Sequence, residues 1–76
     1  MTSNQARRVS ALLTAAMQHP SRPITTGHVM RLYGRLGIAP KRATARGDLK
    51  ALARCGVLIE HGTHNQRHCA LHAYYR

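Results

Sequence analysis

Three cationic side chains, Arg46, Lys50 and Arg54, recur at intervals of four residues in one stretch of the chain. On an α-helix this spacing places them on one face, one turn apart, and the small residues Ala43 and Gly47 fall on the same side. Guanidinium and ammonium groups in such a row suit contacts with phosphates and with guanine edges. The stretch therefore predicts a helix whose exposed face is basic and carries small residues.

A second group of chemically capable side chains lies towards the C-terminal end. It consists of His61, His64, His68 and His72, together with Cys55 and Cys69. The His-x-x-His and His-x-x-x-His spacings occur in zinc sites, but no Cys-x-x-Cys pair is present. In a strand over 67–72, His68 and His72 would share the face opposite Cys69, so one ion would not easily take all three. We expect no metal site and no cofactor, although the sequence leaves open whether these side chains ever bind metal.

Alternatively, the same histidines could make the charge of the surface depend on pH. Several neutral imidazoles near a basic surface become cationic in mildly acidic solution and would strengthen the attraction of that surface for phosphate. Cys69, expected to face inward, is then a small core residue.

Charge is the dominant feature of the composition. Twelve Lys+Arg against two Asp+Glu give 76 residues a formal net charge of +10, and 43% of the residues are hydrophobic. So large an excess favours a polyanionic partner, with compositional drift in a GC-rich coding sequence as the alternative explanation. Two carboxylates are too few for general acid–base pairs, and we expect no enzyme.

The length fits one domain over residues 1–76. No run approaches the ~20 apolar residues of a membrane span, and the first twenty residues lack a signal-peptide pattern. Two cysteines are too few for a disulfide framework. We therefore expect no membrane partner and a cytoplasmic, nucleoid-associated location.

The first element expected is a helix from residue 2 to 19. Thr2 and Gln5 fit a capping box. One buried face is predicted by the spacing of Ala6, Val9, Leu13, Ala16 and Met17, with Leu12 beside it. The same spacing places Arg7 and Arg8 on the opposite, solvent side.

Prolines and glycines divide the rest of the chain. Ser21–Ile24, with two prolines, predicts a short extended segment with Ile24 in the core. A second helix then begins at Thr25 or Thr26 and ends before Gly37. Its predicted buried face consists of Val29, Leu32, Tyr33 and Leu36.

The third helix is predicted over residues 41–55, with Pro40 at its first position and Gly56 as its stop. Its apolar stripe is formed by Ala45, Leu49, Leu52 and Ala53. The β-branched run at 57–60 predicts a strand, and 67–72 returns as a second strand with Cys69 and Leu71 on one face. Tyr74 and Tyr75 follow, either packed over the first helix or in a dimer contact.

Two helices joined by a tight turn and followed by a β-hairpin form the winged helix-turn-helix arrangement. Residues 26–37 and 43–58 resemble the DNA-binding domains of bacterial regulators with this fold. The segment Asp48-Leu49-x-x-Leu52-x-x-x-Gly56-x-Leu58 is similar to the end of the recognition helix and the first wing strand of DeoR- and MarR-type regulators. The resemblance covers roughly residues 6–72 and implies an α+β, mostly α, fold of three helices and a two-stranded hairpin. Gly47 departs from the pattern, which usually has a larger side chain there.

In such a domain the third helix enters the major groove and the wing, residues 60–68, lies near the minor groove. The expected DNA-binding residues are Lys41, Arg42, Thr44, Arg46, Gly47, Lys50, Arg54, His64, Asn65 and Arg67. Each of these residues also has a purely structural interpretation. The seven at positions 41–54 would lie on a solvated helix face, and the three at positions 64–67 would belong to an ordinary hairpin turn. For Arg7, Arg8 and Arg22, nothing in the sequence distinguishes a side chain that contacts phosphate from one that is simply solvated.

The function expected is sequence-specific binding of double-stranded DNA by a small, repressor-like transcriptional regulator. An architectural or excisionase-like factor of a mobile element is the close alternative, and a winged-helix module for RNA or an acidic protein is the more distant one. A homodimer on a palindrome is possible, because one half-site offers limited area. No small-molecule effector is expected, since no sensing domain is attached.

Overall fold

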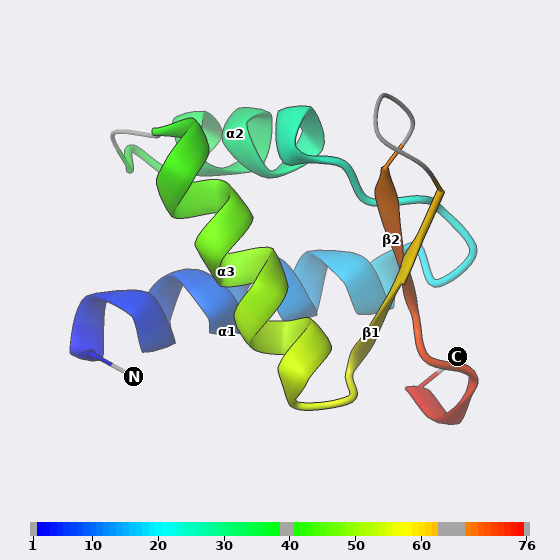
Figure 1. Cartoon of the computed structure of the whole chain (residues 1–76). Helices are drawn as coiled ribbons and strands as arrows, with labels where there is room; N and C mark the ends of the chain where they lie inside the picture. The colour runs from blue at the N-terminus through cyan, green and yellow to red at the C-terminus, as the bar shows by residue number, and fades with distance from the viewer. Residues whose placement is uncertain (1, 39–40, 63–66, 76) are drawn as a thin grey trace.

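Three helices are followed by a two-stranded antiparallel hairpin, as the sequence predicts (Figure 1). The computed structural model describes residues 2–38, 41–62 and 67–75. The elements are α1 (Ser3–Gln18), α2 (Thr26–Arg35), α3 (Arg42–Arg54), β1 (Leu58–His61), β2 (His68–Leu71) and the 3-10 turn η1 (Ala73–Tyr75).

Helix α1 begins as predicted, because the Thr2 hydroxyl accepts a hydrogen bond from the Gln5 backbone N–H at 3.1 Å. The Gln5 side chain does not complete the expected capping box and instead donates to Asp48 of α3. Val9, Leu12 and Ala16 are buried. Two residues expected on the same face are exposed, Ala6 and Met17, because at 100° per residue both lie at the edge of the face that Val9, Leu12 and Ala16 bury.

Helix α2 has a reciprocal cap. The Thr25 hydroxyl accepts from the His28 backbone N–H, and the Thr25 N–H donates to His28 Nδ1, both at 3.2 Å. Tyr33 is fully buried, as is Val29. Leu36, which we expected on the buried face, is 52% exposed because the helix has already ended and the chain turns there through Gly37 at φ +76°.

Helix α3 runs nearly over the predicted range, with Cys55 as its C-cap and Gly56 at φ +78°. Its buried face contains the expected Ala45, Leu49 and Leu52. Pro40, predicted to start the helix, lies outside the described residues.

The hairpin pairs Leu58 with Leu71 and His61 with His68, one residue later in β1 than predicted. Cys69 and Leu71 are buried, as expected. The extended segment before α2 meets β2 at one isolated antiparallel bridge, in which the backbones of Ile24 and Cys69 exchange two hydrogen bonds of 2.7 Å.

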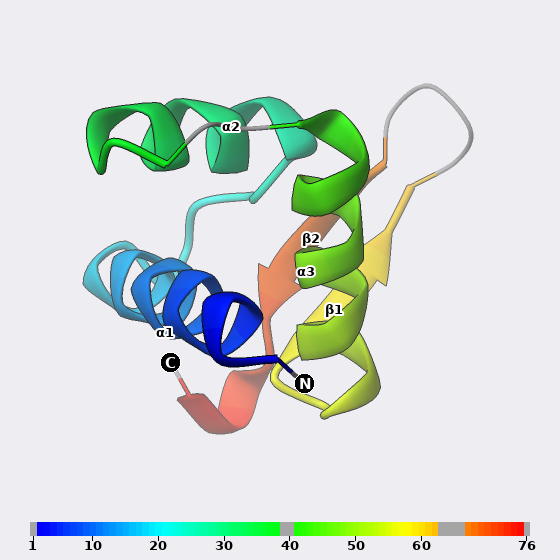
Figure 2. The ribbon, with the colours of Figure 1, turned by 90° about the vertical axis from the view of Figure 1, so that its left-hand side faces the viewer.

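Helix α3 lies at the centre of the molecule and packs on α1, α2 and β1 (Figure 2). In that view α1 and α2 lie on one side, and α3 and the hairpin lie on the other. Tyr75 packs against the core, which confirms the packing alternative for this residue, whereas Tyr74 is 83% exposed.

Candidate nucleic-acid interface

A groove of about 510 Å3 lies between α3, the start of α2 and the hairpin. Its walls bring together three of the predicted DNA-binding residues, Arg46 and Lys50 from α3 and Arg67 from the position just before β2. All three are exposed. The groove thus collects cations from segments that are about 20 residues apart in the sequence.

The electrostatics of this groove are strongly positive. His61 and His68 line it beside the cations, with their rings stacked at a centroid distance of 5.5 Å. Among the described lining residues, Glu60 is the one carboxylate. Thr25 and Thr26 place the N-terminal end of α2 at the wall, where the positive end of the helix dipole also favours an anion.

The exposed face of α3 is as the sequence predicts. Ala43, Arg46, Gly47, Lys50 and Arg54 are all exposed. Lys50 also lines a second, shallower hollow together with Arg54, on the side of α3 that faces β1. A Cβ at Gly47 would meet no atom within 4 Å, so packing within this chain does not require glycine there.

Three predicted residues at the start of α3 do not line the groove. Lys41 is an exposed N-cap without a side-chain hydrogen bond, and Thr44 is half-buried. Arg42 donates to the Met30 sulfur of α2 at 3.8 Å, so its side chain turns towards α2. His64 and Asn65, predicted at the tip of the hairpin, lie outside the described residues.

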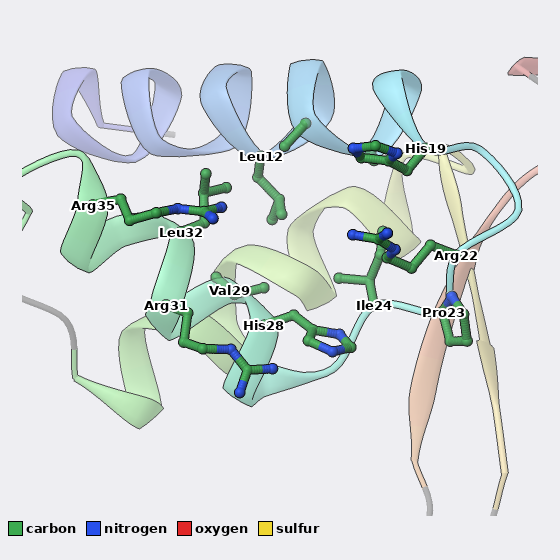
Figure 3. Close-up of a pocket in the computed structure, with 12 residues that line it drawn as sticks. Leu12, His19, Arg22, Pro23, Ile24, His28, Val29, Arg31, Leu32 and Arg35 are labelled. Atoms are coloured by element: carbon green, nitrogen blue, oxygen red, sulfur yellow. The ribbon is translucent and has the colours of Figure 1, made fainter.

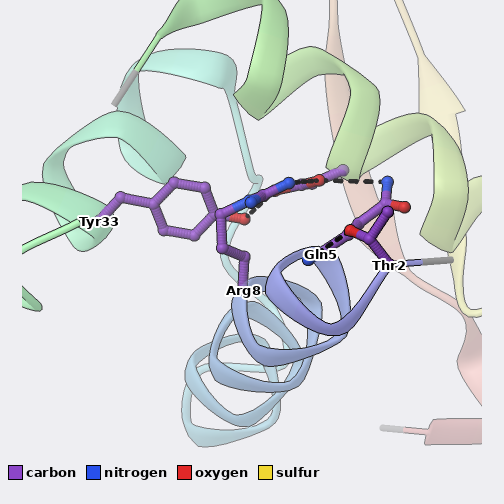
Figure 4. Close-up of polar contacts among 5 residues, drawn as sticks. Thr2, Gln5, Arg8 and Tyr33 are labelled. Atoms are coloured by element: carbon purple, nitrogen blue, oxygen red, sulfur yellow. Dashed lines mark hydrogen bonds and ion pairs between the residues drawn. The ribbon is translucent and has the colours of Figure 1, made fainter. Parts of the chain in front are cut away.

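The orientation of α3 depends on a buried carboxylate, Asp48, which is 1% exposed (Figure 4). Its Oδ2 accepts from Arg8 Nε and from the Tyr33 hydroxyl, both at 2.7 Å. Its Oδ1 accepts from Arg8 Nη2 at 3.2 Å and from Gln5 Nε2 at 3.3 Å. One side chain of α3 is therefore bonded to both α1 and α2.

The pKa shifts in this network follow from its geometry. Burial by itself raises the pKa of the Asp48 carboxyl, but hydrogen bonds from Arg8 and Tyr33 outweigh burial and hold that pKa below its ordinary value. The hydrogen bond to Asp48 raises the pKa of Arg8, and burial followed by the same carboxylate raises the pKa of Tyr33. The network is thus an ionised pair with a neutral phenol.

This network corrects the expectation that Arg8 lies on the solvent side of α1. Its side chain is only 20% exposed, because Asp48 draws it inward. A signal for the buried carboxylate is present in the sequence, since Asp48 stands three residues after Ala45 and four before Leu52, on the apolar stripe.

Within residues 2–38, 41–62 and 67–75, no three His, Cys, Asp or Glu side chains are close enough together to hold a metal ion. No helix in the same ranges is long and apolar enough to cross a membrane.

Comparison of the chain with protein-family models, with curated proteins and with solved structures finds no match.

Proposed function

We propose that this protein binds double-stranded DNA in a sequence-specific manner and acts as a small, repressor-like transcriptional regulator. The observation that carries the proposal is the groove in which Arg46 and Lys50 of α3 face Arg67 of the hairpin. A helix with an exposed basic face, beside a hairpin that carries Arg67, suits a duplex, with the helix in the major groove and the hairpin over the adjacent backbone. The resemblance of residues 26–37 and 43–58 to winged regulators supports the same function.

Roles follow from position on the helix. Arg46 and Lys50, one turn apart at the centre of the exposed face, are placed for guanine edges. Arg54, at the C-terminal end, suits a backbone phosphate, and Arg67 suits a phosphate or the minor groove. In this proposal the protein acts by occupying a site and excluding other proteins from it.

The test is a titration of labelled duplex at several salt concentrations, followed by selection of bound sequences from a random pool. Neutralisation of about four to six phosphates gives a slope of log K against log salt of about −4 to −5. The Arg46→Ala/Lys50→Ala variant removes two charges from the groove. Its matched control, Arg31→Ala/Arg35→Ala, removes two exposed charges from α2, outside the groove.

Sequence-specific binding predicts an enriched motif and a loss of affinity in the groove variant but not in the control. A steep slope without an enriched motif would instead support the architectural, excisionase-like alternative. Preferential binding of RNA, or equal losses in the two variants, would contradict the proposal.

A further inference from the structure

A second groove, of about 470 Å3, lies between α1 and α2 and is independent of the first in its charged residues (Figure 3). We propose that it is a docking site for an acidic, amphipathic helical segment of a partner protein. The proposal adds a protein partner to the DNA-binding function and rests on a different surface of the molecule.

The floor of this groove is apolar. It is formed by side chains from α1, from the extended segment and from α2, namely Leu12, Ala15, Ala16, Ile24, Val29 and Leu32. Half-buried positions such as Ala15 and Leu32 leave apolar surface accessible to a partner. A hydrophobic face of a helix gains from such a floor, whereas the phosphates of a nucleic acid do not.

The rim is cationic. It carries His19, Arg22, His28, Arg31 and Arg35, and no carboxylate is among the described residues that line the groove. In Figure 3 Arg22 and Arg35 approach the floor from opposite ends. An occupant that is apolar on one face and carries carboxylates along its flanks would satisfy both the floor and the rim.

The spacing of the rim favours an extended occupant over a small anion. His28, Arg31 and Arg35 stand three and then four residues apart along one face of α2, a distance of about 10 Å at 1.5 Å per residue. A small carboxylate reaches one or two of these groups at once. A helix of two or more turns reaches the whole row.

A second copy of this chain does not fit the rim. The chain has two acidic side chains, of which Asp48 is buried in its network and Glu60 lies on the hairpin, at the other groove. The carboxylates must therefore come from a different protein. Among the described lining residues the two grooves share Ile24 and no charged side chain, so this partner and DNA can be bound together.

The probe is a fluorescein-labelled helical peptide with leucines at i, i+3, i+4 and i+7 and glutamates on both sides of that stripe. Its control has glutamines in place of the glutamates. We expect the glutamate peptide to bind in fluorescence anisotropy and the control to bind at least about tenfold more weakly. The Arg31→Ala/Arg35→Ala variant should also raise the peptide Kd about tenfold, as expected for the loss of two exposed ion pairs.

Two other variants separate this surface from the DNA site. Arg46→Ala/Lys50→Ala should leave peptide binding unchanged and weaken duplex binding. Ala15→Glu places a carboxylate in the floor at a half-buried position and should abolish peptide binding without loss of the helical circular dichroism spectrum.

Three results would overturn the proposal. The first is equal binding of the glutamate and glutamine peptides, or equal binding of either by wild type and Arg31→Ala/Arg35→Ala. The second is binding of a small amphipathic anion, dodecanoate, by a protein that does not bind the peptide. The third is a dimer in sedimentation experiments that Ala15→Glu dissociates, which would assign the groove to a second copy.

Discussion

The Asp48→Asn substitution tests the buried network most directly. Asparagine keeps the size of aspartate but offers one acceptor oxygen, where the two carboxylate oxygens accept four hydrogen bonds from Gln5, Arg8 and Tyr33. The NH2 group of the asparagine side chain must then face groups that are themselves hydrogen-bond donors, from Gln5, Arg8 or Tyr33. Arg8 also loses the negative charge that holds its guanidinium against α3.

The expected loss is about 3 kcal/mol of unfolding free energy. Removal of one partner from a buried ion pair costs about 3–5 kcal/mol. The lower end applies because the Arg8 side chain is 20% exposed and regains part of its hydration. A 76-residue domain has about 4–11 kcal/mol in total, so the variant loses a large fraction of it. The melting temperature should fall by about 12–24 °C.

The same substitution should change the dependence of stability on acid. The pKa of Asp48 is below its ordinary value in the folded chain, since hydrogen bonds from Arg8 and Tyr33 outweigh the effect of burial. The ionised form therefore stabilises the fold fully above the unfolded-state pKa of about 3.9. This contribution is lost as the pH falls through the lower pKa of the folded state. In Asp48→Asn, the part of the low-pH fall in unfolding free energy (the acid limb) that comes from Asp48 should be absent.

The assay is thermal and urea unfolding, followed by circular dichroism between about pH 2 and pH 7. Tyr33→Phe is the matched control, because it removes one donor but leaves the Asp48–Arg8 ion pair in place, and it should cost about 1.5 kcal/mol, the lower end for a hydrogen bond to a charged group. A melting temperature of Asp48→Asn within about 2 °C of wild type at pH 7 would refute the reasoning. An unchanged acid limb would refute its electrostatic part.

Three further predictions concern single positions. Gly47→Ala should raise the unfolding free energy by about 1 kcal/mol, as measured in melting curves, since its Cβ meets no atom within 4 Å. If the α3 backbone approaches DNA closely at this position, the same variant should weaken duplex binding, and an unchanged duplex affinity would contradict that approach. Cys69→Ser should destabilise by about 1–3 kcal/mol because it buries a hydroxyl, whereas the exposed Cys55→Ser should not; equal urea midpoints would contradict this. Arg67→Ala should weaken duplex binding and reduce the magnitude of the salt slope by about 1 if it contacts a phosphate, and an unchanged slope would remove it from the site.

The helices and the hairpin were predictable because their signals are local. Thr2 and Thr25 cap helices through residues three positions away, and Gly37 and Gly56 end them at positive φ. The apolar spacing of α3 needs no information beyond its own residues. Such signals are complete within one or two turns of chain.

The buried network was not predictable in this way. The 3.6-residue period places Asp48 on the apolar stripe of α3, but Arg8 is 40 residues away in the sequence, and the period does not show that it is the partner of Asp48. The prediction that Leu36 is buried was wrong for a related reason. Its apolar side chain can be identified from the sequence, but its burial depends on where α2 ends. What the sequence could not supply is which helices pack together.

The predictions for the candidate site differ in the same way between local features and features that depend on packing. Arg46 and Lys50 were placed correctly on the exposed face of α3, since one helix determines that face. The convergence of Arg67 with them depends on the path of the hairpin. The side chain of Arg42 was assigned to the site from its sequence position alone, and its contact with Met30 depends on the angle between α2 and α3.

The burial of Asp48 also bears on the charge of the proposed interface. An exposed aspartate on α3 would oppose the phosphates that Arg46 and Lys50 are proposed to bind. Because the carboxylate points inward and is neutralised by Arg8, the outer face of α3 carries cations and small residues. The same side chain thus fixes the orientation of the helix and keeps negative charge off its outer face. A stable variant with apolar residues at positions 8 and 48 and phenylalanine at position 33, so that the buried Tyr33 hydroxyl is not left without an acceptor, should therefore retain duplex affinity. An acidic residue introduced at Gly47 should abolish it.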